Sequence, residues 1–171
     1  CVEPGNVVLV LGASGSGKTT LLRAVSGIGP LIYGAEVRGT VLVGGRDLWS
    51  LGLDGIRRSI QVVNQNPYTH FVEHVVGVDL ANTAMSVHGR DAGERVFGKV
   101  VTMLGLEPLL RRRFFELSGG QLRRVAIAKA MLWDPKVLVL DEPLMWLDDD
   151  GLYEVREVLG VLRSVGKAVL V

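Results

Sequence analysis

Gly12-Ala-Ser-Gly-Ser-Gly-Lys-Thr19 satisfies the pattern G-x-x-x-x-G-K-[ST], and its context decides the fold. It follows a valine-rich apolar run, residues 6–11, which predicts a strand buried on both faces, as in parallel sheets. It precedes residues 18–26, which favour a helix that ends at Gly27. A glycine-rich turn between a buried strand and a helix lets backbone N–H groups surround an anion. This stretch therefore predicts a phosphate-binding loop.

The side chains of this loop suggest how a nucleotide would be held. Lys18 places a positive charge near the β- and γ-phosphates, and the hydroxyl of Thr19 is suited to binding Mg²⁺. The backbone of the loop and of the first helical turn supplies further N–H donors. The predicted nucleotide-binding residues of this stretch are Gly12, Ala13, Ser14, Gly15, Ser16, Gly17, Lys18, Thr19 and Thr20.

The composition excludes several other classes of protein. The chain has 171 residues, 48% of them hydrophobic, and a net charge of +1, which excludes intrinsic disorder. The only cysteine is Cys1, so there is no disulfide framework. The apolar runs are far shorter than the roughly 18–20 residues of a membrane-spanning helix. A pI of about 8.1 argues against a strongly basic surface, so we expect no nucleic-acid partner.

Strands separated by helices predict an α/β fold with a mainly parallel sheet. We expect one domain over residues 1–171, with a core formed by residues 1–65 and 134–171 and an inserted helical subdomain at about 66–133. Strands are predicted at residues 37–45 (part of a hairpin), 60–63, 136–140 and 168–171, and helices at 72–87, 94–104, 121–133 and after the aspartates at 148–150.

On the helix predicted at 121–133, apolar residues share one face. This face comprises Leu122, Val125, Ala126 and Ala130. Arg123 and Arg124 are expected to point elsewhere.

An apolar strand ends in two carboxylates at Asp141 and Glu142. Ligands gather at the carboxyl ends of parallel strands, where the phosphate loop also begins. Asp141 is then placed to hold Mg²⁺ through water, and Glu142 to orient an attacking water or accept its proton. An apolar run followed by acids is common, so the prediction depends on the pairing with the phosphate loop.

Leu117-Ser-Gly-Gly-Gln121 predicts a second helix start that suits an anion. Ser118 is a favourable N-cap, and the two glycines leave backbone amides open. A single phosphate site does not need a second such helix start so far along the chain.

Taken together, these motifs resemble the nucleotide-binding domain of ABC ATPases. The order is that of the family: phosphate loop at 12–19, glutamine loop at 65–67, signature at 117–121, acidic strand at 137–142, then Leu147-Asp148. In this family two domains pair head to tail, and the signature of one closes over the γ-phosphate held by the other. The resemblance implies a P-loop NTPase fold with a mainly parallel sheet, a small antiparallel β part and an inserted helical subdomain.

The resemblance also implies roles for the matching residues. Glu142 would be the general base, and Gln65 would sense Mg²⁺ and the attacking water, with Lys18 as the third catalytic residue. The implied ligands are ATP and Mg²⁺, with Thr19, Gln65 and Asp141 as metal ligands. The nucleotide-binding residues implied to face the ATP of a partner domain are Ser118, Gly119, Gly120 and Gln121. Asp148, also counted among the nucleotide-binding residues, would lie in the loop that meets the partner's phosphate loop.

Residues 60–82 look more specifically like the ATPases of energy-coupling-factor and cobalt-type uptake systems, although His70 stands where that group usually has glutamine. Such ATPases receive a helix of the transmembrane partner beside the glutamine loop. Tyr68 and Phe71 are candidates for that contact, and ordinary packing would explain either residue equally well.

The sequence departs from the family in two further ways. Met145 and Trp146 replace the small residues that usually precede Leu147-Asp148. The aromatic residue that stacks on adenine and the histidine after the final strand have no match in residues 1–171, so we expect the domain to be cropped at both ends.

The predicted function is the ATP-binding and ATP-hydrolysing subunit of an ABC transporter, at the cytoplasmic face of the cell membrane. Its partners would be a second ATPase domain, identical or not, and a transmembrane subunit. One alternative is a soluble ABC ATPase of translation or DNA repair, although the 100 positions from Lys18 to Ser118 leave no room for the coiled coil of repair types. Another alternative is a nucleotide-gated binding module that hydrolyses poorly, against which the intact Glu142 argues.

Overall fold

The computed structural model describes residues 1–13, 15–27, 29 and 34–171. Its centre is a four-stranded sheet in the order β1–β6–β5–β4, and each strand is parallel to its neighbour. The strands are β1 (Val7–Val8), β4 (Ile60–Val63), β5 (Val137–Leu140) and β6 (Ala168–Leu170). The predicted α/β class with a parallel core is therefore confirmed.

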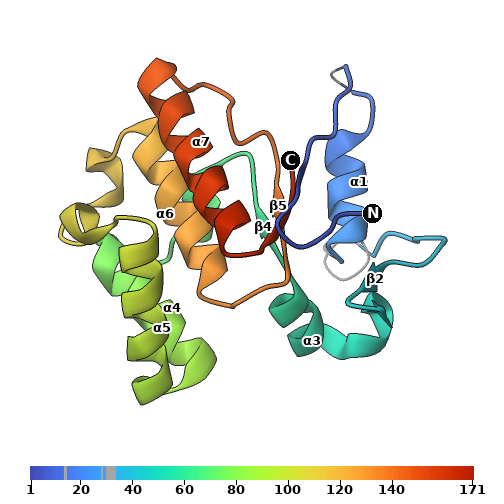
Figure 1. Cartoon of the computed structure of the whole chain (residues 1–171), viewed down its shortest axis with the longest axis horizontal. Coiled ribbons are helices and arrows are strands. Elements are labelled where there is room, and N and C mark those ends of the chain that lie inside the picture. The colour runs from blue at the N-terminus through green and yellow to red at the C-terminus, as the bar shows by residue number, and fades with distance from the viewer. Residues whose placement is uncertain (14, 28, 30–33) are drawn as a thin grey trace.

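The two faces of the sheet are covered by different helices. Along β5, Leu138 and Leu140 join a core with α6 (Gly119–Met131) and α7 (Asp149–Ser164). Val139, on the opposite face, joins a smaller core with Leu22 of α1 (Lys18–Val25). Figure 1 shows α1 on one side of the strands and α6 and α7 on the other. This alternation explains why β5 is apolar at every position.

A helical section connects β4 to β5. It contains η2 (Pro67–His70), α4 (Val76–His88), α5 (Arg90–Met103), η3 (Glu107–Leu109), η4 (Phe114–Glu116) and α6. Helix α4 begins later than predicted because the N–H groups of Val72 and Glu73 donate to the Asp79 side chain instead of entering a helical ladder. No helix in the described part of the chain is long and apolar enough to cross a membrane.

The small antiparallel part is shorter than the predicted strand at 37–45. Strand β2 (Leu42–Val43) pairs with β3 (Arg46–Asp47) across Gly44-Gly45. Both glycines have positive φ, 58° and 77°, as the tight turn of a two-residue hairpin requires. The turn therefore falls at the end of the predicted strand. The η1 (Leu48–Leu51) and α3 (Gly52–Ser59) helices that follow had no sequence prediction.

The first strand corrects another expectation. Residues 6–11 were expected to be buried on both faces, but only Val7–Val8 form a regular strand and the Leu9 side chain is 58% exposed. The reason is that β1 is the edge strand of the sheet, with β6 on one side only. The parallel pairing continues one step beyond both strands, because Val10 N–H donates to the carbonyl of Val171 at 2.6 Å.

Candidate active site

Three strands deliver the candidate catalytic residues to one edge of the sheet. The phosphate loop follows β1, Gln65 follows β4 by two residues, and Asp141-Glu142 directly follows β5. Because β4 and β5 are parallel neighbours, their carboxyl ends lie side by side. Gln65 Nε2 is accordingly 3.3 Å from Glu142 Oε2, although 77 positions separate the two residues.

The phosphate loop leaves the start of α1 open. Gly15 and Gly17 have φ values of 78° and 94°, in the left-handed region that favours glycine. Gly17 is the N-cap of α1, and no side chain of the described residues caps this helix. Lys18 Nζ donates to the carbonyls of Gly12 at 2.8 Å and Ala13 at 3.1 Å. The loop therefore combines uncapped helical N–H groups with a cation, as phosphate binding requires. Ser14 lies outside the described residues.

A pair of oxygen donors beside this loop fits Mg²⁺. The Thr19 hydroxyl donates to Asp141 Oδ1 at 3.2 Å, and Asp141 is buried. Hydroxyl and carboxylate oxygens are the ligand types that Mg²⁺ takes, and Mg²⁺ usually keeps several waters, so Thr19 would hold the ion directly and Asp141 through water. The amide oxygen of Gln65 is a third donor of the required type. Among the described residues no cluster of three His, Cys, Asp or Glu side chains forms a metal site, so phosphate and water oxygens would complete this one.

Glu142 faces a cavity of about 460 Å³ at the mouth of the phosphate loop. Its φ of 49° is unusual for a residue with a side chain, and such strained conformations concentrate at functional sites. The residues that line this cavity are Gly15, Gly17, Lys18, Thr19, Thr20, Gln65, Glu142 and Met145. The cavity therefore gathers part of the predicted phosphate loop with Gln65 and Glu142, and Asp141 lies beside it through its bond from Thr19.

Met145 has a contact that the sequence analysis did not foresee. Its sulfur is 2.7 Å from Gln65 Nε2, the same nitrogen that lies near Glu142. The thioether is a weak hydrogen-bond acceptor, so it competes with Glu142 for the Gln65 amide. The only sequence signal was that Met145 departs from the small residue usual at this position.

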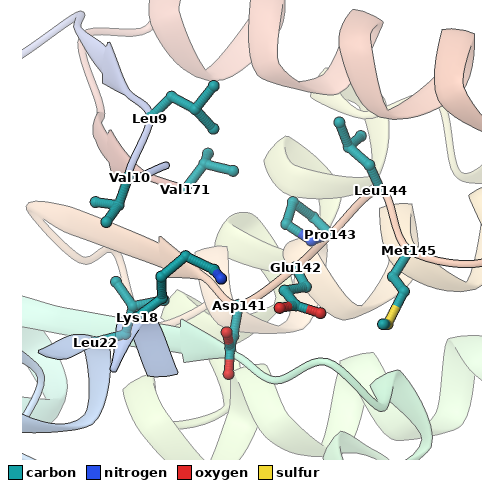
Figure 2. A pocket seen from close by; sticks show the side chains of 10 residues that line it. All are labelled: Leu9, Val10, Lys18, Leu22, Asp141, Glu142, Pro143, Leu144, Met145 and Val171. Atoms are coloured by element: carbon teal, nitrogen blue, oxygen red, sulfur yellow. The ribbon is translucent and has the colours of Figure 1, made fainter. Parts of the chain in front are cut away.

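A second, mostly apolar cavity of about 240 Å³ adjoins Lys18. Figure 2 shows Leu9, Val10 and Val171 on one side of it and Lys18, Asp141 and Glu142 on the other. The polar groups of the site thus have aliphatic side chains on one side of them.

The second predicted helix start, at Ser118, is capped by side chains, unlike the start of α1. Ser118 Oγ accepts the N–H of Gln121 at 3.1 Å, and Gln121 Oε1 accepts the N–H of Ser118 at 3.3 Å. This reciprocal pair is a capping box. A Cβ on Gly120 would lie 2.8 Å from the Cα of Gly151. Gly120 is therefore required where α6 packs against α7, whatever its role toward a nucleotide.

Asp148 lies near the helix start at Ser118–Gln121 and caps a helix in the same way. Its Oδ1 accepts the N–H of Gly151 at 2.9 Å and so caps α7. A Cβ on Gly119 would lie 2.8 Å from the Leu147 side chain, which places the signature next to the Leu147-Asp148 segment. In the described structure neither Ser118–Gln121 nor Asp148 lines the cavity at Lys18.

Arg123 corrects a prediction, because it does not point away from the core. It is 4% exposed, and its Nη1 donates to the carbonyl of Asn64 at 3.1 Å. Burial lowers the pKa of Arg123, and the Asp141 carboxylate opposes this effect. The hydrogen bond and the carboxylate together explain how α6 accommodates a buried cation.

His70 is a further functional candidate whose role the sequence did not predict. Its Nε2 accepts the N–H of Asn64 at 2.9 Å. Burial, followed by the positive charges of Lys129 and Arg123, lowers the pKa of His70 to about 4. The ring is therefore neutral near pH 7, as an acceptor must be. The only sequence signal was the departure from glutamine, a residue that is also able to accept this bond.

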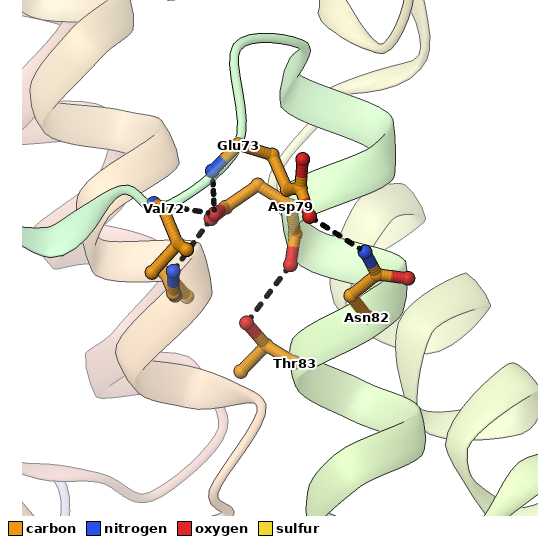
Figure 3. Close-up of polar contacts among 6 residues, drawn as sticks. Val72, Glu73, Asp79, Asn82 and Thr83 are labelled. Carbon is orange, nitrogen blue, oxygen red and sulfur yellow. Dashed lines mark hydrogen bonds and ion pairs between the residues drawn. The ribbon is translucent and has the colours of Figure 1, made fainter.

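Asp79 connects α4 to α6 (Figure 3). Asp79 is 1% exposed, and its Oδ1 accepts the N–H groups of Val72 at 2.9 Å and Glu73 at 3.1 Å. Its Oδ2 forms an ion pair of 2.7 Å with Lys129 Nζ. A buried carboxylate with these partners keeps the segment after the glutamine loop attached to α6.

The two aromatic candidates near the glutamine loop have different environments. Phe71 stacks on Phe114, with ring centroids 3.8 Å apart and planes inclined by 16°. Ordinary packing therefore accounts for Phe71. Tyr68 is exposed, so it remains a candidate for contact with a partner.

Comparisons with known proteins agree with this geometry. Residues 1–145 match the sequence model of a family described as ABC transporter. A relative from Streptomyces avermitilis, named as an ABC transporter ATP-binding protein, is 40% identical over 171 residues, or 99% of this chain and 30% of the relative. A similarly named protein of Treponema denticola is 35% identical, over 99% of this chain and 35% of its own length. The chain thus spans about a third of these relatives.

Two further similarities concern a narrower group. The energy-coupling factor transporter ATP-binding protein EcfA2 of Bacillus subtilis is 37% identical over 96% of this chain and 60% of its own length. Among solved structures, cbiO1 of Clostridium perfringens, part of the ABC transporter complex cbiONQ, superposes with a TM-score of 0.83 at 29% identity. That match covers 99% of this chain and 67% of cbiO1. The resemblance to energy-coupling-factor and cobalt-type ATPases is therefore confirmed.

Proposed function

Since the chain belongs to the ABC transporter family, as an ATP-binding domain close to the energy-coupling-factor and cobalt type, we propose that it hydrolyses ATP at the Lys18 cavity. The observation that carries the proposal is the meeting of Lys18, Gln65 and Glu142 around one cavity. These residues come from α1 and from the loops after β4 and β5, and packing alone gives no reason to collect a cation, an amide and a carboxylate there.

Each residue has a separate task in this proposal. The N–H groups of the loop and of α1 bind the phosphates, and Lys18 exchanges its bonds to the Gly12 and Ala13 carbonyls for phosphate oxygens. Thr19, the Gln65 amide oxygen and, through water, Asp141 would hold Mg²⁺, and the ion would neutralise charge on the phosphates. Glu142 accepts a proton from the attacking water, which Gln65 helps to orient.

A second domain would complete the site. Ser118–Gln121 lie away from the Lys18 cavity, which supports this. The signature can therefore contact a nucleotide only if another molecule holds it. In its capping box Ser118 Oγ accepts a bond, which leaves its hydroxyl hydrogen able to donate to a phosphate. We infer that ATP closes such a pair of domains and that hydrolysis reopens it.

We infer further that this cycle drives a transmembrane partner from the cytoplasmic face of the membrane. The exposed Tyr68, beside the glutamine loop, supports a contact there. The cbiO1 structure belongs to a protein described as part of a transporter complex, which supports the same arrangement.

The test is ATP turnover of the intact protein and its Glu142→Gln variant. Removing a general base lowers turnover by about 10²–10⁴-fold, while Mg·ATP binding persists because the phosphate loop is unchanged. Glu157→Gln, an exposed change on α7, is the matched control and retains wild-type turnover. Equal turnover of Glu142→Gln and wild type would remove Glu142 from the reaction.

A further inference from the structure

The peptide groups of Asn64 are held at both polar atoms by side chains. The N–H donates to His70 Nε2 at 2.9 Å, and the carbonyl accepts from Arg123 Nη1 at 3.1 Å. Asn64 lies just beyond β4 and directly before Gln65. Its backbone therefore determines where the chain leaves the sheet and where the Gln65 side chain begins.

The two side chains reach Asn64 from different elements. His70 ends η2, so it closes the short loop that contains Gln65. Arg123 comes from α6, the helix whose first turn is the signature. The same α6 also carries Lys129, which is paired with Asp79. The loop that holds Gln65 is thus fastened internally by His70 and to α6 by Arg123.

We propose that His70 and Arg123 are positioning residues that clamp the Asn64 backbone and thereby hold the Gln65 amide at Glu142. The inference deepens the proposed function and rests on it, because it assigns what keeps Gln65 in place during hydrolysis. Neither residue lines the Lys18 cavity in the described structure. Both reach Gln65 through the Asn64 backbone, and Arg123 also interacts electrostatically with Asp141.

The burial of Arg123 supports this assignment. A buried arginine is costly to retain, and the acceptor that Arg123 reaches is the carbonyl before Gln65. The Gln65 side chain itself is exposed, and its partners among the described residues are Glu142 and the Met145 sulfur. Its position must therefore come largely from the backbone that carries it.

The surroundings of His70 favour its role as an acceptor. The positive charges of Lys129 and Arg123 on α6 act on the ring. Arg57 of α3 lines, together with His70, a further cavity of about 460 Å³ that is distinct from the one at the phosphate loop. A protonated imidazole would meet these cations and would also lose its bond from Asn64 N–H. Glutamine at this position would accept the bond through its amide oxygen without titrating.

The experiment compares His70→Leu, which removes the acceptor, with His70→Gln, which restores one. We expect His70→Leu to lower kcat for ATP about 2- to 10-fold, the effect of one neutral hydrogen bond, with KM changed less than about twofold. His70→Gln retains kcat within about twofold of wild type, because its amide oxygen accepts the same bond. His74→Leu, an exposed change a few residues away, is the matched control.

Arg123 is tested with a paired set of variants. Arg123→Met removes a charged donor, and we expect kcat to fall about 10- to 100-fold if the variant folds. Arg123→Lys keeps the cation and recovers part of the loss. The control is Arg156→Met, an exposed arginine on α7.

Nuclear magnetic resonance separates this proposal from the proposed function, because it needs no hydrolysis. In His70→Leu we expect the Asn64 amide to exchange with solvent several-fold faster and the Gln65 side-chain amide signals to shift, and we expect His70→Gln to reverse both changes. Failure of the wild type to hydrolyse ATP would count against the proposed function alone. Unchanged Asn64 exchange in His70→Leu, or changed exchange with unchanged Gln65 signals, would overturn the clamp.

Discussion

The two glycine-rich helix starts of this protein look alike in sequence and differ in structure. Helix α1 has Gly17 as its N-cap, and no side chain of the described residues caps it. Helix α6 has Ser118 as its N-cap, and Ser118 and Gln121 satisfy each other's backbone N–H groups. The first start is open to an anion, whereas the second is already capped by its own side chains.

The glycines of the two starts serve different physical purposes. Gly15 and Gly17 adopt positive φ, and a Cβ on either would meet no described atom within 4 Å, so they are needed for backbone conformation. Gly120 has no space for a Cβ, because α7 passes directly beside it. A loop that binds phosphate therefore requires conformational freedom, and a helix start that must pack closely requires a small residue.

The largest expected effect would test the open start. Lys18→Ala removes a charged donor to phosphate, so we expect Mg·ATP affinity to fall about 10- to 100-fold by calorimetry. Lys99→Ala, an exposed change on α5, is the control and retains the affinity. Ser118→Ala also leaves the affinity of a single domain unchanged if the two starts differ as described. Wild-type affinity in Lys18→Ala would contradict the assignment of the phosphate loop.

Packing at the capped start predicts the next effect. Gly120→Ala overpacks the contact with α7, so we expect the free energy of unfolding to fall by about 1–3 kcal/mol. Gly98→Ala on α5, where a Cβ meets no described atom within 4 Å, is a matched control and raises stability by up to about 1 kcal/mol. Urea unfolding measures both variants. An unchanged midpoint in Gly120→Ala would contradict the close packing of α6 against α7 at Gly120.

We expect acid to lower the free energy of unfolding through protonation of His70. Its pKa is about 4 in the folded protein against an ordinary value of 6.5, so below pH 6.5 the unfolded state binds more protons. His70 therefore does not change the free energy of unfolding above pH 6.5. Between pH 6.5 and pH 4 it lowers this free energy by at most about 1.4 kcal/mol for each pH unit of acidification. Thermal unfolding across this window measures the effect. His70→Gln should lose less stability there than wild type, and an identical loss would assign the effect to other groups.

The smallest effect concerns the cap itself. Ser118→Ala removes the acceptor for the Gln121 N–H, and we expect a loss of about 1 kcal/mol in unfolding free energy. Ser118→Asn keeps a capping oxygen and should retain most of the stability. No loss in Ser118→Ala would show that the N-terminus of α6 is satisfied by other groups.

Much of the site followed from local patterns. The phosphate loop, the acids after β5 and the cap at Ser118 each depend on neighbouring residues, so their spacing identified them. Local patterns gave wrong predictions where the environment of a residue depends on residues far away in the sequence. Arg123 resembles a surface arginine of an amphipathic helix until α6 packs beside Asn64, and β1 resembles a central strand until the order of the sheet places it at the edge.

From its residues alone, this chain specified its parallel α/β class, its phosphate loop and the order of its motifs, because these depend on backbone preferences and charges within short segments. Packing of the whole chain then assigned partners to His70, Arg123 and Met145 around Gln65. Those partners follow from how β4, η2 and α6 fit together, and no short segment holds that information.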